Sequence, residues 1–162
     1  MSTLLNSADA VIVGGGVVGC FAALELCRRG LRPVLLEKEQ VGAEQSSKNW
    51  GFIRQQGRAD SEIPLMVAAN SAWSSFESKY GEDIGWRQSG NLRLIREIPD
   101  LRWYQDWVER GGALGVPVEL VDDQRLRQLL PGAQGRWVGA MLTANDGQAD
   151  PTRAVHAVAR AA

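Results

Sequence analysis

The sequence of 162 residues predicts an α/β fold, in which a strand–helix–strand opening is followed by an α+β insertion of antiparallel strands and helices. The stretch 10–38 reads AVIVGGGVVGCFAALELCRRGLRPVLLEK, which is an apolar run, a glycine cluster, an apolar helical segment and a second apolar run. Beyond residue 84 the pattern changes to short strand-like segments between amphipathic helices, and an alanine-rich helix ends the chain. Since an open parallel sheet needs more than two strands, we expect the first sheet to be incomplete within this chain.

The glycine cluster fits the GxGxxG pattern of Rossmann-like nucleotide-binding units. Gly14, Gly16 and Gly19 occupy its three glycine positions, directly after the β-branched strand 11–13, which we expect to be covered on both faces. In such a unit one glycine permits the tight turn, one lets the backbone approach a pyrophosphate, and one lets the helix pack closely on the strand. The helix predicted over 17–29 would direct its free amide groups and positive dipole end at the phosphates.

Glu37 supplies the acid that such a unit needs. It ends the second predicted strand, 34–37, and lies 37 − 14 = 23 positions after the first motif glycine. A carboxylate there can accept hydrogen bonds from ribose hydroxyls and would repel a 2′-phosphate, which argues against NADP. A glycine turn that merely joined a strand to a helix would not require this acid, so the stretch predicts a dinucleotide site.

Composition favours a small-molecule ligand. The hydrophobic share of 44% and the charged share of 23% are ordinary for a globular protein, and the formal net charge of −1 offers no basic field for nucleic acid or an anionic membrane surface. Residues 1–9 carry no basic segment and glycines cut short the apolar run that follows, so we expect neither a secretory signal nor a transmembrane helix. A cytoplasmic location is expected.

The cysteines and the single histidine do not predict a metal site. Cys20 and Cys27 lie 27 − 20 = 7 positions apart on one predicted helix, too far to bridge each other, and are expected to be small buried hydrophobes in a reducing compartment. His156 stands among alanines and is expected to be a surface or packing residue rather than an acid–base group. These three residues cannot form a closed tetrahedral set, so no metal is expected.

Downstream of Glu37, the polar loop 40–57 precedes a series of short elements. Helical spacing from residue 60 to 80 carries an aromatic stripe, which we interpret as core rather than as a cofactor platform. The segments 84–88 and 91–96 predict a hairpin or two adjacent strands. The remaining predictions are a helix from Pro99 that ends at Gly111 and Gly112, a strand at 118–121, a helix at 122–130, a strand at 136–143, and a last helix with Asp150 as N-cap and Pro151 at its first position.

These residues together resemble a known family, the FAD-dependent oxidoreductases of the D-amino-acid oxidase type, which includes glycine oxidase, sarcosine oxidase and bacterial amino-acid and opine dehydrogenases. The matching pieces are VIVGGGVVG with Glu37, SSKNWGFIRQQ, a helix with Trp73, the strand pair around RQSGNLRLI, and NDGQADP before a helix. The resemblance covers almost the whole chain. It implies an FAD-binding region with a flavin loop at 1–83, the start of a substrate-domain-like insertion at 84–145, and a return helix at 146–162.

The resemblance also implies roles for individual residues. Arg54 falls where the sarcosine-oxidase branch carries an arginine that holds the substrate carboxylate, which a planar guanidinium can bind through two parallel hydrogen bonds. No histidine or cysteine stands in the region used for covalent flavin attachment, so FAD is expected to be non-covalent. The implied cofactor contacts are Gly14, Gly16, Val17, Val18 and Gly19 at the pyrophosphate, Glu37 with its neighbour Lys38 at the adenosine, Ser46, Ser47, Lys48 and Asn49 along the ribityl and pyrophosphate region, and Trp50 and Gly51 over the flavin ring.

The same resemblance implies an amine or amino-acid oxidoreductase, in which a hydride passes from the amine-bearing carbon to flavin N5 and water hydrolyses the imine. We expect the chain to be the N-terminal portion of such an enzyme and to be inactive without a C-terminal half. The alternatives are a noncatalytic nucleotide-binding module, a subunit completed by a partner chain, and an NAD-dependent dehydrogenase. At the level of residues, Ser46 and Ser47 could cap a short helix, Arg54 could be a solvated loop arginine, and Asp150 is expected to be a structural cap.

Overall fold

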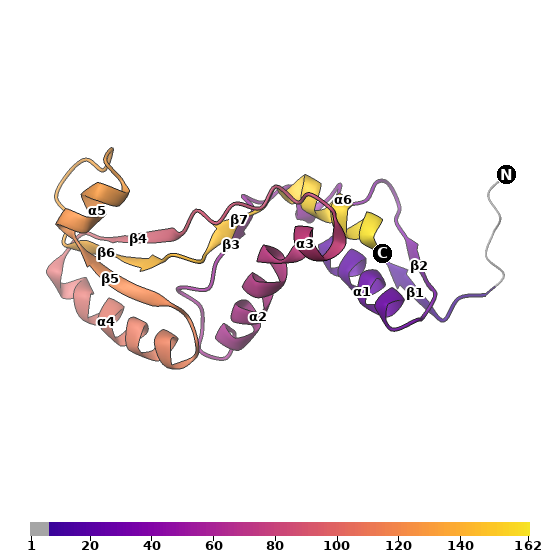
Figure 1. Ribbon diagram of the computed structural model, residues 1–162, viewed down its shortest axis with the longest axis horizontal. Helices are drawn as coiled ribbons and strands as arrows, with labels where there is room; N and C mark the ends of the chain where they lie inside the picture. The colour runs from indigo at the N-terminus through magenta and orange to yellow at the C-terminus, as the bar shows by residue number, and fades with distance from the viewer. Residues whose placement is uncertain (1–6) are drawn as a thin grey trace. The chain divides into compact units, whose positions relative to one another are not determined.

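The computed structural model describes residues 7–162, which fold into two compact units whose elements are labelled in Figure 1. Unit 1 contains the described residues up to Phe52, together with Ser75–Trp86 and Ala149–Ala162. Unit 2 contains Ile53–Ser74 and Arg87–Gln148. The chain therefore leaves unit 1 and returns to it twice, so that unit 2 is an insertion in two parts.

Unit 1 is built on a parallel strand–helix–strand unit. β1 (Ala10–Val13), α1 (Val17–Arg28) and β2 (Pro33–Leu36) follow one another, and the strands pair in parallel with Ile12 opposite Leu35. The predicted opening of the fold is therefore confirmed. Unit 1 also contains the 3-10 helix η1 (Gln45–Ser47), α3 (Phe76–Tyr80) and α6 (Pro151–Ala161).

The core of unit 1 lies where α1 and α6 contact each other. α6 begins as the sequence predicts, because the Asp150 carboxylate accepts a hydrogen bond of 2.9 Å from Arg153 N and Pro151 occupies the first turn. Small apolar side chains let the two helices approach closely. The residues that α1 and α6 bury are Cys20, Ala23, Leu24, Ala154, Val155, Ala157 and Val158.

One face of the β1–β2 sheet is exposed. The side chains of Val11 and Val13 are 62% and 86% exposed, and Leu36 of β2 is 53% exposed. Side chains alternate between the two faces of a strand, so Ile12 points to the opposite side, where its Cγ2 lies 3.4 Å from the position of a Cβ on Gly19 of α1. The expectation that β1 is covered on both faces is therefore wrong for the described residues, because α1 covers only the Ile12 face.

Unit 2 contains an antiparallel sheet with strand order β4-β6-β5. Its strands are β4 (Asn91–Ile95), β5 (Val118–Asp122) and β6 (Gly139–Thr143), and every residue of the central strand β6 is buried. The helices of this unit are α2 (Ile63–Ser74), α4 (Ile98–Ala113) and α5 (Asp123–Leu129). The two-residue strand β7 (Gly147–Gln148) pairs with β3 (Phe52–Ile53), whose second residue belongs to this unit.

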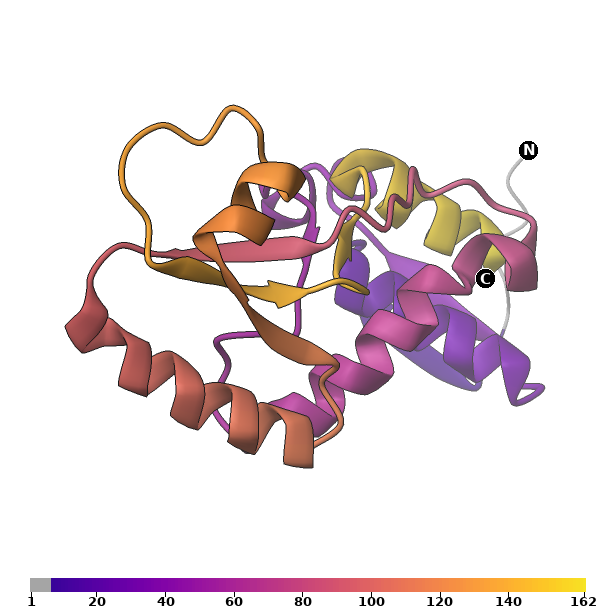
Figure 2. The ribbon, with the colours of Figure 1, turned by 60° about the vertical axis from the view of Figure 1, so that its left-hand side comes forward.

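Two helices of unit 2 cover opposite faces of this sheet, as Figure 2 shows for α4 and α5. On one face Met141 of β6 packs against Trp107 of α4, and Ile63 of α2 joins the same cluster. On the other face Ala140, the neighbour of Met141 on the strand, packs against Leu126 of α5. The two-residue period of a strand thus gives β6 one apolar contact surface for each helix.

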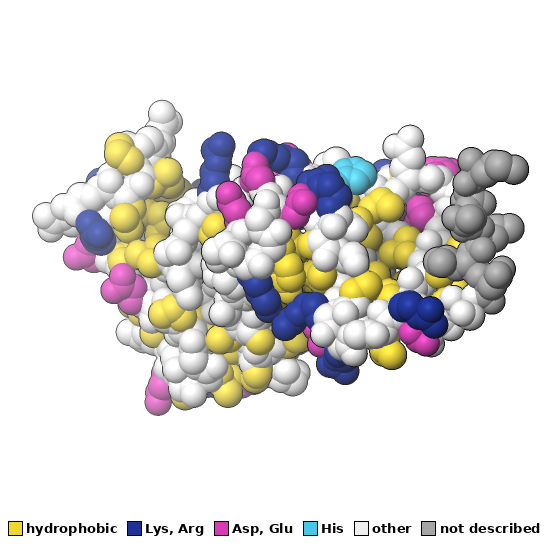
Figure 3. Space-filling view, turned by 45° about the vertical axis from the view of Figure 1, so that its right-hand side comes forward, with side chains coloured by type: hydrophobic (Ala, Val, Ile, Leu, Met, Phe, Trp, Pro, Cys, Tyr) yellow, Lys and Arg dark blue, Asp and Glu magenta, His cyan; other side chains and the backbone are white. Residues whose placement is uncertain are grey.

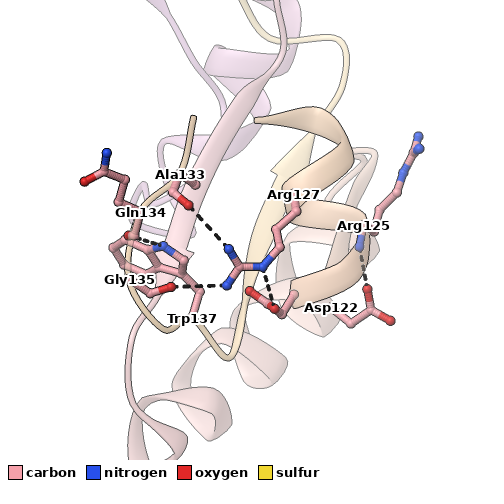
Figure 4. Close-up of polar contacts among 8 residues, drawn as sticks. Asp122, Arg125, Arg127, Ala133, Gln134, Gly135 and Trp137 are labelled. Carbon is pink, nitrogen blue, oxygen red and sulfur yellow. Dashed lines mark hydrogen bonds and ion pairs between the residues drawn. The ribbon is translucent and has the colours of Figure 1, made fainter. Parts of the chain in front are cut away.

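The loop after α5 is held by side-chain hydrogen bonds, which Figure 4 shows. The Arg127 guanidinium donates to Asp123 Oδ2 at 2.8 Å and to the carbonyl oxygens of Ala133 and Gly135 at 3.5 and 3.1 Å. At the other end of the helix, Asp122 caps α5 by accepting a hydrogen bond of 2.7 Å from Arg125 N. The Arg127 bonds therefore hold the connection from α5 to β6 against the helix, and the Asp122 bond holds the start of the helix.

Three local predictions were wrong. Residues 84–88 form no strand beyond an isolated bridge between Arg87 and Gln148, and β4 pairs with β6 rather than with a hairpin partner. Gly85 has a φ of +66°, which interrupts an extended segment there. Gly111 and Gly112 lie inside α4 instead of ending it. A Cβ on Gly111 would stand 2.7 Å from the Trp107 ring, so the missing side chain at residue 111 leaves space for that ring. The helix predicted over 60–80 is two helices, α2 and α3.

The face drawn in Figure 3 carries interspersed basic and acidic side chains rather than a field of one sign. Cys20 and Cys27 are free, the first buried and the second half-buried. Within residues 7–162 no helix is long and apolar enough to cross a membrane. The same residues contain no group of three or more histidine, cysteine or acidic side chains that could hold a metal ion.

Candidate cofactor and substrate sites

The conformation and packing of the glycine loop between β1 and α1 require residues without side chains. Gly14 has a φ of +104°, a conformation that favours glycine, and its amide donates to Leu36 O at 2.8 Å. A Cβ on Gly19 would stand 2.0 Å from Gly14 O, so the first turn of α1 can lie against the loop only because residue 19 has none. The loop is therefore tied to β2 on one side and packed by α1 on the other.

Glu37 is bonded to this loop. Its Oε2 accepts a hydrogen bond of 2.7 Å from Gly15 N, and its Oε1 accepts one of 3.0 Å from Glu39 N. The bond from Gly15, followed by that from Glu39, lowers the pKa of Glu37 below its ordinary value, so the side chain is ionised at neutral pH. An ionised carboxylate offers about four acceptor positions, which leaves capacity for ribose hydroxyls. Gly15 lies between two motif glycines, which is the sequence signal for its role, although the GxGxxG pattern itself leaves this position unspecified.

Ser46 caps α1 from a distant part of the chain. The N-cap residue Gly16 has no side chain, and Ser46 Oγ instead accepts a hydrogen bond of 2.9 Å from Val17 N. The hydroxyl keeps its own proton and can donate it to an anion. The first turn of α1 contains no acidic residue, so its positive dipole end is not neutralised by a side chain. The local sequence is compatible with Ser46 as a cap of its own short helix, whereas the helix that it caps is α1.

The segment after Ser46 is held by local bonds and by the start of α6. Asn49 Nδ2 donates to Ser46 O at 2.8 Å, and Asn49 Oδ1 accepts from Gly51 N at 2.7 Å. Gly51 has a φ of +71°, and a Cβ there would lie 2.0 Å from Ala149 O. Trp50 is left 85% exposed, with its ring edge-on to Phe52 at 6.3 Å between centroids.

The other predicted cofactor residues of unit 1 lie near these groups but make different contacts. Lys38 Nζ pairs with Glu44 at 2.8 Å, which raises the pKa of Lys38, and Lys48 Nζ lies 3.8 Å from the other Glu44 oxygen. Ser47 Oγ donates to Glu44 O at 3.3 Å. Val18 is 81% exposed at the start of α1. The glycine loop, Glu37 and Ser46 thus form one compact group, and the charge of Lys38 is directed to Glu44.

Arg54 belongs to unit 2 and has no acidic partner within ion-pair distance in the part of the chain described. Its Nη1 donates to Gln56 O at 2.9 Å. Burial, followed by the like charges of Arg58 and Arg93, lowers the pKa of Arg54, while Asp146 acts in the opposite sense. The guanidinium remains charged, because arginine does not deprotonate in proteins at ordinary pH.

A buried network that sequence analysis did not assign holds the residue next to Arg54. Asp146 Oδ1 accepts from Gln55 N at 3.0 Å and from Gln55 Nε2 at 2.8 Å, and Asp146 Oδ2 accepts from Asn91 Nδ2 at 3.3 Å. Gln55 and Asp146 are each 1% exposed. Both residues stand in segments quoted for the resemblance, but their pairing across 91 positions leaves no local signal.

A protein-family model described as FAD dependent oxidoreductase (DAO) matches residues 9–162. The chain belongs to this family. Among curated relatives, human mitochondrial sarcosine dehydrogenase is 28% identical over 162 residues, which cover 98% of this chain and 18% of that protein. Glycine oxidase of Geobacillus kaustophilus (strain HTA426) is 31% identical, with 95% of this chain and 43% of that protein covered.

Solved structures of this family show the same fold. The L-amino acid deaminase of Proteus myxofaciens superimposes with a TM-score of 0.95 at 26% identity, covering 99% of this chain and 37% of that one. L-proline dehydrogenase from P. horikoshii gives a TM-score of 0.90, again at 26% identity, with 98% and 42% covered. The chain of this DAO-family member therefore spans less than half the length of these relatives.

These matches confirm the predicted family, the α/β fold class, the class of FAD-dependent oxidoreductases and FAD as its cofactor. The relatives include a mitochondrial protein and bacterial ones, so a cytoplasmic location stays a prediction. The individual cofactor and substrate residues also stay predictions, and so do the boundaries 1–83, 84–145 and 146–162.

Proposed function

We propose that the chain is the N-terminal portion of an FAD-dependent amine or amino-acid oxidoreductase, and that unit 1 holds the ADP part of FAD at the glycine loop. The observation that carries this proposal is the convergence of three features at the start of α1: the three consecutive glycines Gly14–Gly16 of the loop, the ionised Glu37 and the hydroxyl of Ser46. The positive end of α1, capped by a neutral hydroxyl and with no acidic side chain in its first turn, suits a pyrophosphate.

Each group of this site has a separate task in the proposal. The α1 amides and the Ser46 hydroxyl would bind phosphate oxygens, and Glu37 would accept hydrogen bonds from the adenosine ribose. Trp50 and Gly51 would lie by the flavin, with the positive φ of Gly51 letting the backbone pass close to Ala149. Bound FAD would supply the acceptor for a hydride from a carbon that bears an amine.

Arg54 is proposed to bind the carboxylate of an amino-acid substrate. The support is that the Arg54 guanidinium is partly desolvated and has no acidic partner among the described residues. A carboxylate bound through two parallel hydrogen bonds would neutralise its charge. The names of the relatives agree with such a substrate, since sarcosine, glycine and proline each combine an amine with a neighbouring carboxylate.

A nucleotide-binding module completed by further protein is the second candidate. The exposed apolar face formed by Val11, Val13 and Leu36 favours it, because parallel sheets are normally covered on both faces. The covering elements would come from the same polypeptide or from a partner subunit, and oxidation would then require them.

Titration of the 162-residue protein with FAD, followed at the flavin absorption band, tests the proposal. We expect saturable uptake, about tenfold weaker in Glu37→Gln because hydrogen bonds to charged groups exceed those to neutral ones. Glu39→Gln is the matched control, since the exposed Glu39 contacts Glu37 only through its backbone amide and should leave uptake unchanged.

Three outcomes would count against parts of the proposal. Protein that stays colourless at every FAD concentration would refute FAD binding by this chain. A change of NADH fluorescence without FAD uptake would favour the NAD-dependent alternative. FAD that binds but is not bleached by any amine or amino acid without oxygen would favour the noncatalytic module.

A further inference from the structure

Two guanidinium groups of unit 2 approach one point beside Gly57. The position of a Cβ on Gly57 lies 2.8 Å from Arg93 Nη1 and 3.3 Å from Arg54 Nη1. Gly57 has a φ of +69°, so a glycine is favoured there by the backbone as well as by the space. The absence of a side chain at residue 57 thus lets two like charges lie close together.

Arg93 is positioned by aromatic rings instead of by an acid. Its guanidinium carbon lies 4.8 Å from the centre of the Trp103 ring and 5.7 Å from that of Tyr104, both on α4. Arg93 is opposite Met141 in the pairing of β4 with β6, so it points to the face of the sheet that α4 covers. Stacking of this kind orients a guanidinium and leaves its N–H groups free to bind a ligand.

Arg58 adds a third guanidinium with an unused donor. Its Nε is buried and has no hydrogen-bond partner among the described residues. The backbone of Arg58 is held in place, because its carbonyl accepts a hydrogen bond of 3.4 Å from Trp107 Nε1. A buried N–H group is normally paired, so this one indicates an acceptor that residues 7–162 do not supply.

No acid balances this cluster within residues 7–162. Arg54, Arg58 and Arg93 form no ion pair there, whereas exposed arginines such as Arg110 and Arg153 pair with Asp60 and Asp83. Asp146 attracts Arg54 from a longer distance, but its carboxylate already accepts hydrogen bonds from two residues. Like charges that are partly desolvated repel each other, so a ligand with one negative charge would compensate the cluster only in part.

We propose that Arg54, Arg58 and Arg93 form one binding site for a dicarboxylate substrate, that is, an amine or amino acid with a second carboxylate. The inference rests on the role proposed for Arg54, which would bind the carboxylate next to the amine. Arg58 and Arg93 would bind the second carboxylate. Two carboxylates bring two negative charges and up to four acceptor oxygens to three guanidinium groups, which is the better match in charge and in hydrogen bonds.

Binding to the 162-residue protein without FAD tests this site. The probes are iminodiacetate, sarcosine and inorganic phosphate at constant ionic strength, measured by calorimetry and by the shift in melting temperature. We expect iminodiacetate to bind at least tenfold more tightly than sarcosine. Arg58→Gln and Arg93→Gln should each remove this preference and leave sarcosine binding unchanged, and Arg54→Gln should weaken both ligands.

Arg96→Gln is the matched control, because Arg96 follows the same strand but stacks on Trp137 outside the cluster. If a glutamine variant fails to fold, Arg58→Lys and Arg93→Lys, which keep the charge and lose the planar fork, should still reduce the preference for iminodiacetate.

Equal binding of iminodiacetate and sarcosine to the wild-type protein would overturn the proposal, and so would a preference for iminodiacetate that persists in the variants of both Arg58 and Arg93. Tighter binding of phosphate than of iminodiacetate would overturn the assigned ligand class. Iminodiacetate binding by a protein that takes up no FAD would leave this site standing while the proposed function failed.

Discussion

Replacement of Gly19 by alanine should destabilise the protein and prevent uptake of FAD. A Cβ at residue 19 would stand 2.0 Å from Gly14 O, where ordinary van der Waals contacts begin at 3.4 Å. The opposing atom belongs to the backbone of the glycine loop, so it cannot move aside as a flexible side chain could. Either α1 or the loop must shift by more than 1 Å. A shift of the loop would stretch the hydrogen bond of 2.8 Å from Gly14 N to Leu36 O.

The size of this effect follows from two opposing contributions. Overpacking of this severity costs about 3 kcal/mol, and the better helix propensity of alanine returns about 1 kcal/mol. The net loss of about 2 kcal/mol should lower the melting temperature by about 4–8 °C for a protein of this length. FAD uptake should be lost because the displaced loop carries the phosphate-binding amides.

Gly112→Ala is the matched control for this substitution. Gly112 also lies within a helix, α4, but a Cβ there would meet no atom within 4 Å. Alanine should therefore stabilise the protein by about 0.5–1 kcal/mol without changing FAD uptake. Thermal unfolding followed by circular dichroism and flavin titration measure both variants. A Gly19→Ala protein that melts at or above the wild-type temperature would refute the packing argument.

Two further predictions concern the groups beside the glycine loop. Ser46→Ala should lower the free energy of unfolding by about 1 kcal/mol, because Val17 N loses its acceptor. The control Ser78→Ala should change the free energy of unfolding little, because the Ser78 hydroxyl only donates to Ser75 O within its own helix region. Equal denaturation midpoints for the two variants would contradict a capping role for Ser46. Since the pKa of Glu37 is lowered in the folded protein, the stability that Glu37 contributes is present above the ordinary glutamate pKa of about 4.3 and is lost as the pH falls through the folded value. The melting temperatures of wild type and Glu37→Gln should therefore differ at pH 7 and converge in acid, and a difference that stays constant down to pH 3 would exclude this cause.

The elements that the sequence predicted well are those with local causes. The run from β1 to β2 follows from β-branched residues, three glycines and an acid, all within 29 positions. The start of α6 follows from Asp150 and Pro151, since a cap and a first-turn proline act on adjacent residues. In both places the interacting residues are close together in the sequence, so the local sequence pattern is enough to predict the structure.

The wrong predictions concern contacts between distant segments. β4 was assigned a neighbour within a few residues, whereas its partner β6 lies 139 − 91 = 48 positions downstream, measured between the first residues of the two strands. The sequence of β4 is equally compatible with either partner, because its alternating side chains would fit both. Gly111 gives a second example, since it lies inside α4 with the Trp107 ring in the space of a missing Cβ, a packing role that a helix-stop rule does not consider.

The candidate sites show the same division. The motif glycines and Glu37 could be found from the sequence, but the capping of α1 by Ser46 joins residues 29 positions apart and the bond from Gln55 to Asp146 joins residues 91 apart. In both interactions a backbone amide donates a hydrogen bond to a side-chain oxygen, which needs only one polar residue at the right place in space. Such bonds leave no periodic pattern, and so the sequence predicted at most a local cap at Ser46 and no role for Asp146.

Glu37 has a structural task as well as the one proposed for it with the nucleotide. The bond from Gly14 N to Leu36 O places the end of β2 beside the loop, and this brings the next residue, Glu37, against Gly15. A Cβ on Gly15 would lie 3.1–3.2 Å from three atoms of the Glu37 side chain, so a larger residue at position 15 would push the Glu37 side chain by a few tenths of an ångström. One carboxylate thus accepts a hydrogen bond from the loop and is also the proposed acceptor for the ribose. If Glu37→Gln weakens FAD and ADP equally while the melting temperature falls only slightly, the loss lies in the direct contact with adenosine. A large fall in melting temperature would instead indicate that affinity is lost because the loop is no longer held by Glu37.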